Sequence, residues 1–155
     1  MALSELETVC QQEEKYQFSS FDGSDALGIG LKIVEEIASK GKSVEVDIEL
    51  DGHCLFHHAM KGTSLSNTSW IRRKKNMMKL DDKSTLRVFL ELEQSGKTFE
   101  QTYGQKPDEF AAGGGGFPLR ITGKGTCGTI CVSGLPHKED HEAIIMALQY
   151  HAERK

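Results

Sequence analysis

The chain has 155 residues, of which 37% are apolar, 7% aromatic and 27% charged, and its formal net charge is −4. This length suits one ordinary domain. The composition is too apolar for a disordered tail and too charged for a membrane protein. The acidic balance argues against a dedicated nucleic-acid binder, because such proteins normally carry a basic excess.

The start of the chain and its cysteines predict a cytoplasmic location. The segment 1–7 contains early acids and no apolar run, unlike a secretory signal. The longest apolar run, 143–148, is too short to cross a bilayer, so we expect no membrane insertion. The cysteine spacings match no zinc ribbon or CxxC motif, and reduced thiols are expected. The cysteines are Cys10, Cys54, Cys127 and Cys131.

Two helices are predicted first. Residues 2–15 read as a polar helix with one apolar stripe. The next helix begins at Ser24 or Asp25 and ends at Gly41. Gly28 and Gly30 weaken it by about 1 kcal/mol each relative to Ala, and we attribute them to close packing against a neighbouring element. The expected buried stripe of this helix is Leu27, Leu31, Val34 and Ala38, widened by Ile37.

A β-hairpin follows. Residues 44–50 alternate apolar and acidic side chains, which predicts a strand with one buried and one wet face. Asp51-Gly52 suits a two-residue turn into a second strand, 53–60. With regular pairing, His57 faces the covered side of the sheet, and His58 faces out beside Glu45.

The second half alternates helices with another hairpin. Residues 65–80 predict a helix, and so do 84–94, although the alternating leucines there also fit a strand. Residues 104–116 are a loop-rich connection. Strands 117–121 and 126–133 pair through a Gly123-Lys124 turn, with Cys127 and Cys131 on one face as small core residues. A last helix runs from His137 to the C-terminus. Two hairpins among helices predict an α+β fold with an antiparallel sheet.

Two glycine-rich segments are candidate ligand-binding positions, and the second matches a known motif only by chance. The run Gly113–Gly116 leads directly into Phe117-Pro118, so it is either a backbone-lined turn that binds an anion or a plain tight connection. The segment 123–128 spells GxGxxG, but it opens a strand. A dinucleotide site requires a helix there, so we dismiss the match.

Two polar clusters are candidate sites. His137 and His141 have a spacing that can chelate a metal, but helix capping by the first and packing by the second explain them better. Trp70 stands beside the basic run 72–75, which is either a solvated helix face or a site for one carboxylate or phosphate group. A residue of this run that turns inward, Arg73 or Lys74, either binds the ligand or pairs with an internal acid.

Two stretches resemble the GlcG/HbpS-like, or haem-degrading-domain, family. The first is Asp51-Gly52-His53-Cys54-Leu55-Phe56 with Met60-Lys61-Gly62-Thr63, and the second is Gly114-Gly115-Gly116-Phe117-Pro118-Leu119 with 128–134 and Asp140. The segments 70–74 and 132–136, with Asp140-His141, resemble a short cytosolic subgroup of that family. The resemblance covers roughly residues 25–150.

This resemblance implies a profilin-like antiparallel sheet of about five strands flanked by helices, assembled into homo-oligomers. Some family members bind haem or help to degrade it, and the eukaryotic branch of the subgroup is linked to chaperone-type delivery of membrane proteins. Close relatives often carry His where this chain has Gly113, which puts any function of that His in doubt here.

We therefore expect a single domain, 1–155, with helix 2–15 as an extension, that acts as an oligomeric cytoplasmic binding protein for a small anionic ligand or haem. Alternatives are an enzyme of haem or small-molecule metabolism using the same cleft, without an identifiable catalytic set, and a protein-interaction adaptor. A buried basic residue facing the glycine turn favours the first two, and a bare apolar groove the third. The expected ligand-binding residues, none of them a metal ligand, are Trp70, Arg73, Lys74, Gly114, Gly115, Gly116 and Phe117.

Overall fold

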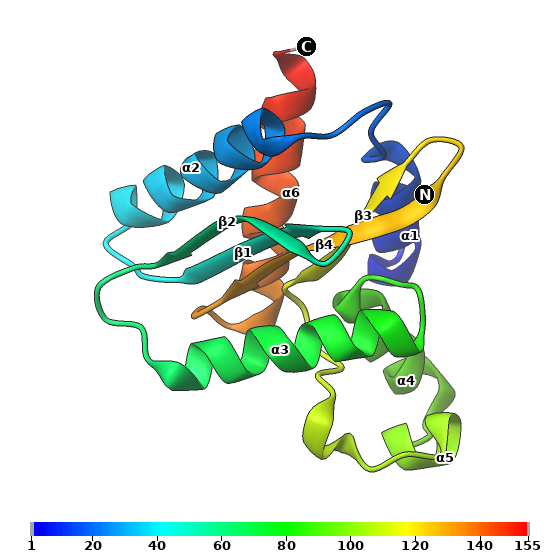
Figure 1. Ribbon diagram of the computed structural model, residues 1–155. Coiled ribbons are helices and arrows are strands. Elements are labelled where there is room, and N and C mark those ends of the chain that lie inside the picture. Colours follow the sequence, from blue (N-terminus) through cyan, green and yellow to red (C-terminus); the bar gives the residue numbers. More distant parts are fainter. Residues whose placement is uncertain (1, 155) are drawn as a thin grey trace.

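The computed structural model describes residues 2–154 and centres on an antiparallel sheet of order β2-β1-β4-β3 (Figure 1). The α+β class and both hairpins are confirmed. The described residues form four strands in this sheet rather than about five. The strands are β1 (Glu45–Leu50), β2 (His53–Ala59), β3 (Gly116–Ile121) and β4 (Gly125–Ser133).

The predicted helices form, including the ambiguous one at 84–94. Ser84 caps that helix by accepting from the Arg87 N–H, which confirms helix over strand. A short helix, α5, and the 3₁₀ turn Pro107–Glu109 (η1) add structure around the predicted loop. The last predicted helix is described to residue 154. The α-helices are α1 (Glu5–Lys15), α2 (Gly23–Ser39), α3 (Leu65–Leu80), α4 (Thr85–Ser95), α5 (Phe99–Tyr103) and α6 (His137–Glu153).

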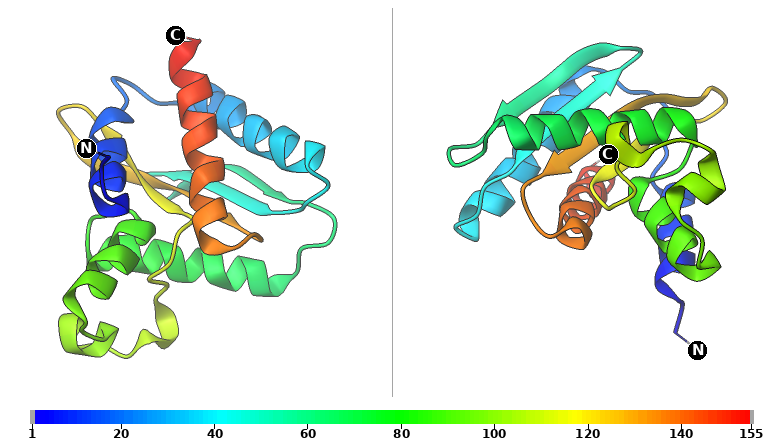
Figure 2. Two further views of the ribbon diagram at one scale, coloured as in Figure 1. Left: turned by 180° about the vertical axis from the view of Figure 1, so that it is seen from behind. Right: turned by 90° about the horizontal axis from the view of Figure 1, so that it is seen from below.

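Helices cover both faces of the sheet. The main core joins one face, with Val46 and Ile48, to α2 and α6 (Figure 2, left). On the other face, Cys131 of β4 packs with Ile71 and Met78 of α3. The acidic face of β1, expected to be wet, is therefore covered, and Glu45 is only 1% exposed.

Helix α2 buries a stripe that overlaps the predicted one only at Ile37, with Val34 partly buried against the core. Ala26, Ile29, Ile33 and Ile37 are buried, whereas Leu27 and Leu31 are 52% and 46% exposed. The sequence carries two apolar stripes on this helix, and periodicity alone could not rank them.

Two details of α2 depend on its local contacts. The helix is capped by Asp22, two or three residues before the predicted Ser24 or Asp25, because the Asp22 side chain accepts from the Ser24 and Asp25 N–H groups. Gly30 is confirmed as a close-packing position, since a Cβ there would overlap the Phe56 ring of β2.

The first hairpin has the predicted turn but a different register. Asp51 and Gly52 both have positive φ, as this turn requires. Glu49 pairs with Cys54 and Ile48 with Phe56, so the intervening residue of β2 is bulged. Asp47 consequently pairs with His57 and Val46 with His58. The predicted facing of both histidines was wrong, because one extra residue exchanges the faces of a strand.

A second irregularity separates the two cysteines of β4. Leu119 pairs with Gly128 and Arg120 with Thr126, which leaves Cys127 out of register. Cys127 packs against the main core and Cys131 against α3, so the prediction that both share one face was wrong. Cys131 is fully buried, as expected of a core residue.

Helix α1 is attached through a buried acid. Glu13 is 2% exposed, and its carboxylate accepts from the N–H and hydroxyl of Ser84. The same group pairs with Arg87 of α4 at 3.2 Å and with Arg120 of β3 at 3.0 Å. Within residues 2–154, none of the helices has both the length and the apolar character needed to span a membrane.

Candidate functional site

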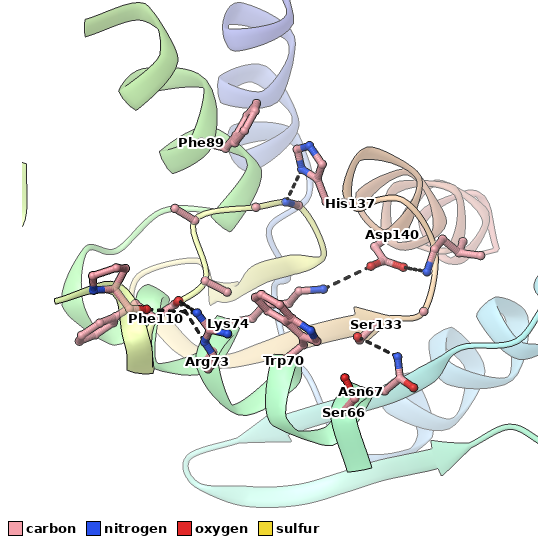
Figure 3. Close-up of a pocket in the computed structure, with 17 residues that line it drawn as sticks. Ser66, Asn67, Trp70, Arg73, Lys74, Phe89, Phe110, Ser133, His137 and Asp140 are labelled. Atoms are coloured by element: carbon pink, nitrogen blue, oxygen red, sulfur yellow. Dashed lines mark hydrogen bonds and ion pairs between the residues drawn. The ribbon is translucent and has the colours of Figure 1, made fainter. Parts of the chain in front are cut away.

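A cavity of about 580 Å³ opens between α3, the loop before β3 and the start of α6 (Figure 3). Its volume is in the range of small-molecule sites. Aromatic side chains, glycine backbone and a few polar groups share the lining. The principal side chains are Asn67, Trp70, Arg73, Lys74, Phe89, Phe110, Ser133, His137 and Asp140, and Gly113 and Gly114 contribute backbone.

Arg73 lies against Trp70 at this cavity. Its guanidinium carbon is 4.1 Å from the Trp70 ring centroid, a cation–π distance. Its Nε and Nη2 donate to the carbonyl of Phe110, and Nη2 also donates to the carbonyl of Pro107. Among residues 2–154, no carboxylate lies within ion-pair distance of Arg73. Its positive charge is therefore not neutralised.

Lys74 is the residue that turns inward. It is 4% exposed, and its Nζ donates to the Val132 carbonyl at 2.6 Å and lies 3.3 Å from Asp140 Oδ2. The other carboxylate oxygen of Asp140 accepts from the Leu135 N–H. Burial raises the pKa of Asp140 to about 6, while the Lys74 charge and that N–H oppose the shift. Lys74 therefore has the internal acid partner that defines a structural ion pair.

The glycine run has two parts with different environments. Gly113 and Gly114 line the cavity, and the Gly114 N–H donates to His137 Nδ1 at 2.9 Å. Gly115 has φ +117°, and a Cβ there would overlap the Lys74 ammonium and the Val132 carbonyl. Gly116 donates its N–H to Thr85. Gly115, Gly116 and Phe117 are buried outside the cavity lining, as in a tight connection.

The two histidines of the α6 start have separate surroundings. Burial lowers the pKa of His137, so its ring is neutral at pH 7. Because Nδ1 accepts from Gly114, the ring proton lies on Nε2. His141 is fully buried, with Nε2 2.7 Å from Gln12 Oε1, and burial lowers its pKa to about 4. The packing interpretation of His141 is confirmed.

The sequence reasoning missed several lining side chains. Phe89 lies 4.6 Å from the His137 ring, and Phe110 holds Arg73 through its carbonyl. Asn67 donates to Ser133 across the cavity wall. Phe89, Phe110 and Asn67 come from separate segments without a shared motif, whereas Ser133 and Asp140 carried a signal through the family resemblance.

The lining favours an anion with an apolar body. Among the described residues of the lining, Arg73 and Lys74 are cationic, Asp140 is the only acid, and His137 is neutral at pH 7. One net positive charge therefore remains at full ionisation of Asp140, in a chain whose net charge is −4. The exposed Trp70 face and the two phenylalanines supply flat apolar contact.

Comparisons with known proteins agree on one family. Residues 21–149 match the family described as haem degrading protein HbpS-like. A UPF0303 protein of Azotobacter vinelandii is 38% identical over 144 residues, covering 93% of this chain and 87% of the relative. The crystal structure of Ybr137w protein superposes with a TM-score of 0.87 at 27% identity, covering 99% and 91% of the two chains. The PduOC:heme complex gives 0.68 at 18% identity, with 84% and 94% covered.

Proposed function

We propose, since the chain belongs to the haem degrading protein HbpS-like family, that it binds a small anionic ligand or haem in the cavity beside Trp70. One observation carries the proposal. The Arg73 guanidinium lies on the Trp70 ring at the cavity with no acid of residues 2–154 within ion-pair distance, which suits a carboxylate attached to a flat ring system.

The family and a solved relative in complex with heme support haem as the ligand. The apolar lining suits a porphyrin face, and Arg73 suits a propionate. The one histidine in the lining, His137, uses Nδ1 to accept from Gly114 and carries its proton on Nε2. Coordination of iron by Nε2 would require this nitrogen to lose its proton. The proposed binding therefore depends on the carboxylates and the apolar ring of the ligand, not on an iron–histidine bond.

A ligand-binding role fits this site better than an adaptor role. The Lys74 ammonium occupies the space that a Cβ of Gly115 would need, so a buried basic residue does face the glycine turn. This feature was expected of a binding protein or an enzyme. A cytoplasmic location and homo-oligomeric assembly, with itself as protein partner, complete the proposal.

Titration with haem, read by absorbance, tests the proposal. Arg73→Ala should weaken binding by about tenfold or more, because a charge-assisted hydrogen bond is lost. The melting temperature of the free protein should change little, since Arg73 donates to backbone carbonyls and, among residues 2–154, forms no ion pair. Arg72→Ala is the matched control, because Arg72 is exposed and pairs with Glu109 away from Trp70.

Iron-free protoporphyrin separates two modes of binding. If the propionates and the ring carry the affinity, protoporphyrin and haem should both bind and both respond to Arg73→Ala. A parallel melting screen with small carboxylates and phosphate covers the non-haem ligands. Absence of binding by every probe, or equal effects of Arg72→Ala and Arg73→Ala, would contradict the proposal.

A further inference from the structure

A carboxylate, a thiol and an imidazole meet on the α3-facing side of the first hairpin, away from the cavity. His57 Nδ1 is 2.8 Å from Asp47 Oδ2, and Cys54 Sγ is 4.0 Å from the same oxygen. The ligand atoms of the three residues all lie within 4.8 Å of one another. The bulge in β2 creates this cluster, since regular pairing would have turned His57 to the opposite face.

The surrounding charges favour a cation. Glu45, Asp47 and Glu49 project from β1 on this side, and among residues 2–154 Lys75 is the only ammonium within ion-pair distance of them. It lies 2.7 Å from Asp47 and 3.2 Å from Glu49. The three carboxylates therefore outnumber this ammonium by two negative charges, beside a strand whose Glu45 and Asp47 side chains are only 1% and 7% exposed. A divalent cation would neutralise them.

The histidine is also oriented as a metal ligand is. Its second nitrogen, Nε2, lies 3.2 Å from Glu45 Oε2. The Thr68 hydroxyl of α3 lies 2.8 and 2.9 Å from the two oxygens of that carboxylate and fixes it in place. Metal-binding histidines usually donate their other ring N–H to a carboxylate that is itself hydrogen-bonded. The contacts of Glu45 with His57 and Thr68 add to those within the Asp47–Cys54–His57 cluster.

We propose that Asp47, Cys54 and His57 form a binding site for Zn²⁺. Thiolate, imidazole and carboxylate are the ligands that zinc prefers, at about 2.0–2.3 Å. The ion would replace the hydrogen bond between His57 Nδ1 and Asp47 Oδ2, and the Cys54 thiol would release its proton to solvent. Lys75 stays on the other Asp47 oxygen. Because Cys54 and His57 are exposed, a water completes a four-coordinate site.

Calorimetric titration of the chelator-treated full chain with Zn²⁺ is the first test. We expect one Zn²⁺ per chain and at least about tenfold weaker binding of Mg²⁺, which prefers oxygen ligands. Co²⁺ should bind in the same place and give a thiolate-to-metal charge-transfer band. No Zn²⁺ binding, or Co²⁺ binding without that band, overturns the proposal.

Paired variants localise the site. Cys54→Ser and His57→Gln should each weaken Zn²⁺ binding by about tenfold or more, and Cys54→Ser should abolish the cobalt band. His58→Gln, on the same strand, and Cys127→Ser, on β4 of the other hairpin, are matched controls and should leave binding unchanged. Thr68→Val should weaken binding by about tenfold while keeping the band, because it removes only the support of Glu45.

A measurement on the unaltered chain covers the case of a variant that misfolds. Zn²⁺ should protect Cys54 from alkylation, as read by mass spectrometry of the peptides, while Cys127 continues to react. Equal reactivity of Cys54 with and without Zn²⁺, or equal losses in the variants and their controls, would rule the site out.

Discussion

Arg73 and Lys74 are neighbours in the sequence, but their charges have different partners. The Lys74 ammonium pairs with the buried carboxylate of Asp140. The Arg73 guanidinium lies on the Trp70 ring and donates to backbone carbonyls. Consecutive helical residues point about 100° apart, so one can enter the protein while the next lines a cavity. We therefore expect Lys74 to contribute to the stability of the fold and Arg73 to contribute to ligand binding.

The buried pair makes a specific stability prediction. Lys74→Met should lower the free energy of unfolding by about 3–5 kcal/mol at pH 7.5, because it leaves the Asp140 carboxylate buried without its cation. The double variant Lys74→Met/Asp140→Asn should recover part of this loss. Urea denaturation measures both, and a Lys74→Met variant as stable as the parent would contradict the pairing.

The pH dependence of that variant follows from the same carboxyl. The pKa of Asp140 in the folded chain, about 6, is above its ordinary value of 3.8, so the fold favours the protonated acid. Its contribution to stability consequently falls as the pH rises from about 4 to 6. Without Lys74 this pKa rises further, so the deficit of Lys74→Met should be smaller at pH 5 than at pH 7.5.

At the scale of elements, α1 shows how an acid can anchor a helix that reads as polar. Glu13 follows Leu6 and Val9 at helical spacing, yet its charge gives no apolar signal. Its partners, Ser84, Arg87 and Arg120, lie at least 71 residues away in the sequence. Their convergence is a tertiary property that local periodicity could not predict.

Removing this acid should therefore detach α1. Glu13→Ala should cost about 3 kcal/mol or more, because two arginines and the Ser84 N–H lose their shared partner. Glu14→Ala is the control, since Glu14 is exposed and should change stability by less than about 0.5 kcal/mol. Equal effects of both substitutions in thermal unfolding would show that the buried network contributes nothing.

The same distinction between local and distant causes separates the successful predictions from the failed ones. The presence of the helices, the Asp51-Gly52 turn and the pairing of strands within each hairpin follow from nearby residues, and the sequence predicted them, although α1 and α2 begin at other residues than predicted. No characteristic residue type marks the bulges in β2 and β4 in the sequence. The faces predicted for His57, His58 and Cys127 were therefore wrong. Trp70 and the basic residues Arg73 and Lys74 lie at the cavity, but the phenylalanines of the lining and the internal partner of Lys74 depend on the assembled fold.

For the whole molecule, the exposed leucines of α2 bear on assembly. Leu27 and Leu31 are one helical turn apart and so share a face, which is directed away from the core. The same helix packs beside β2, which lies at one end of the sheet and has a partner on one side only. An apolar helix face next to a sheet edge is a surface that proteins commonly cover by association.

Sedimentation should therefore give a species larger than the 17.2 kDa chain at micromolar concentration. The double substitution Leu27→Glu/Leu31→Glu should shift the protein toward the monomer, because burying two carboxylates in an apolar contact is unfavourable. Leu3→Glu is the control, since Leu3 is equally exposed, at 49%, but lies before α1. A monomer in the unaltered chain would contradict self-association. An oligomer that survives the double substitution would place the contact elsewhere, because charge repulsion between the new acids should otherwise separate the copies.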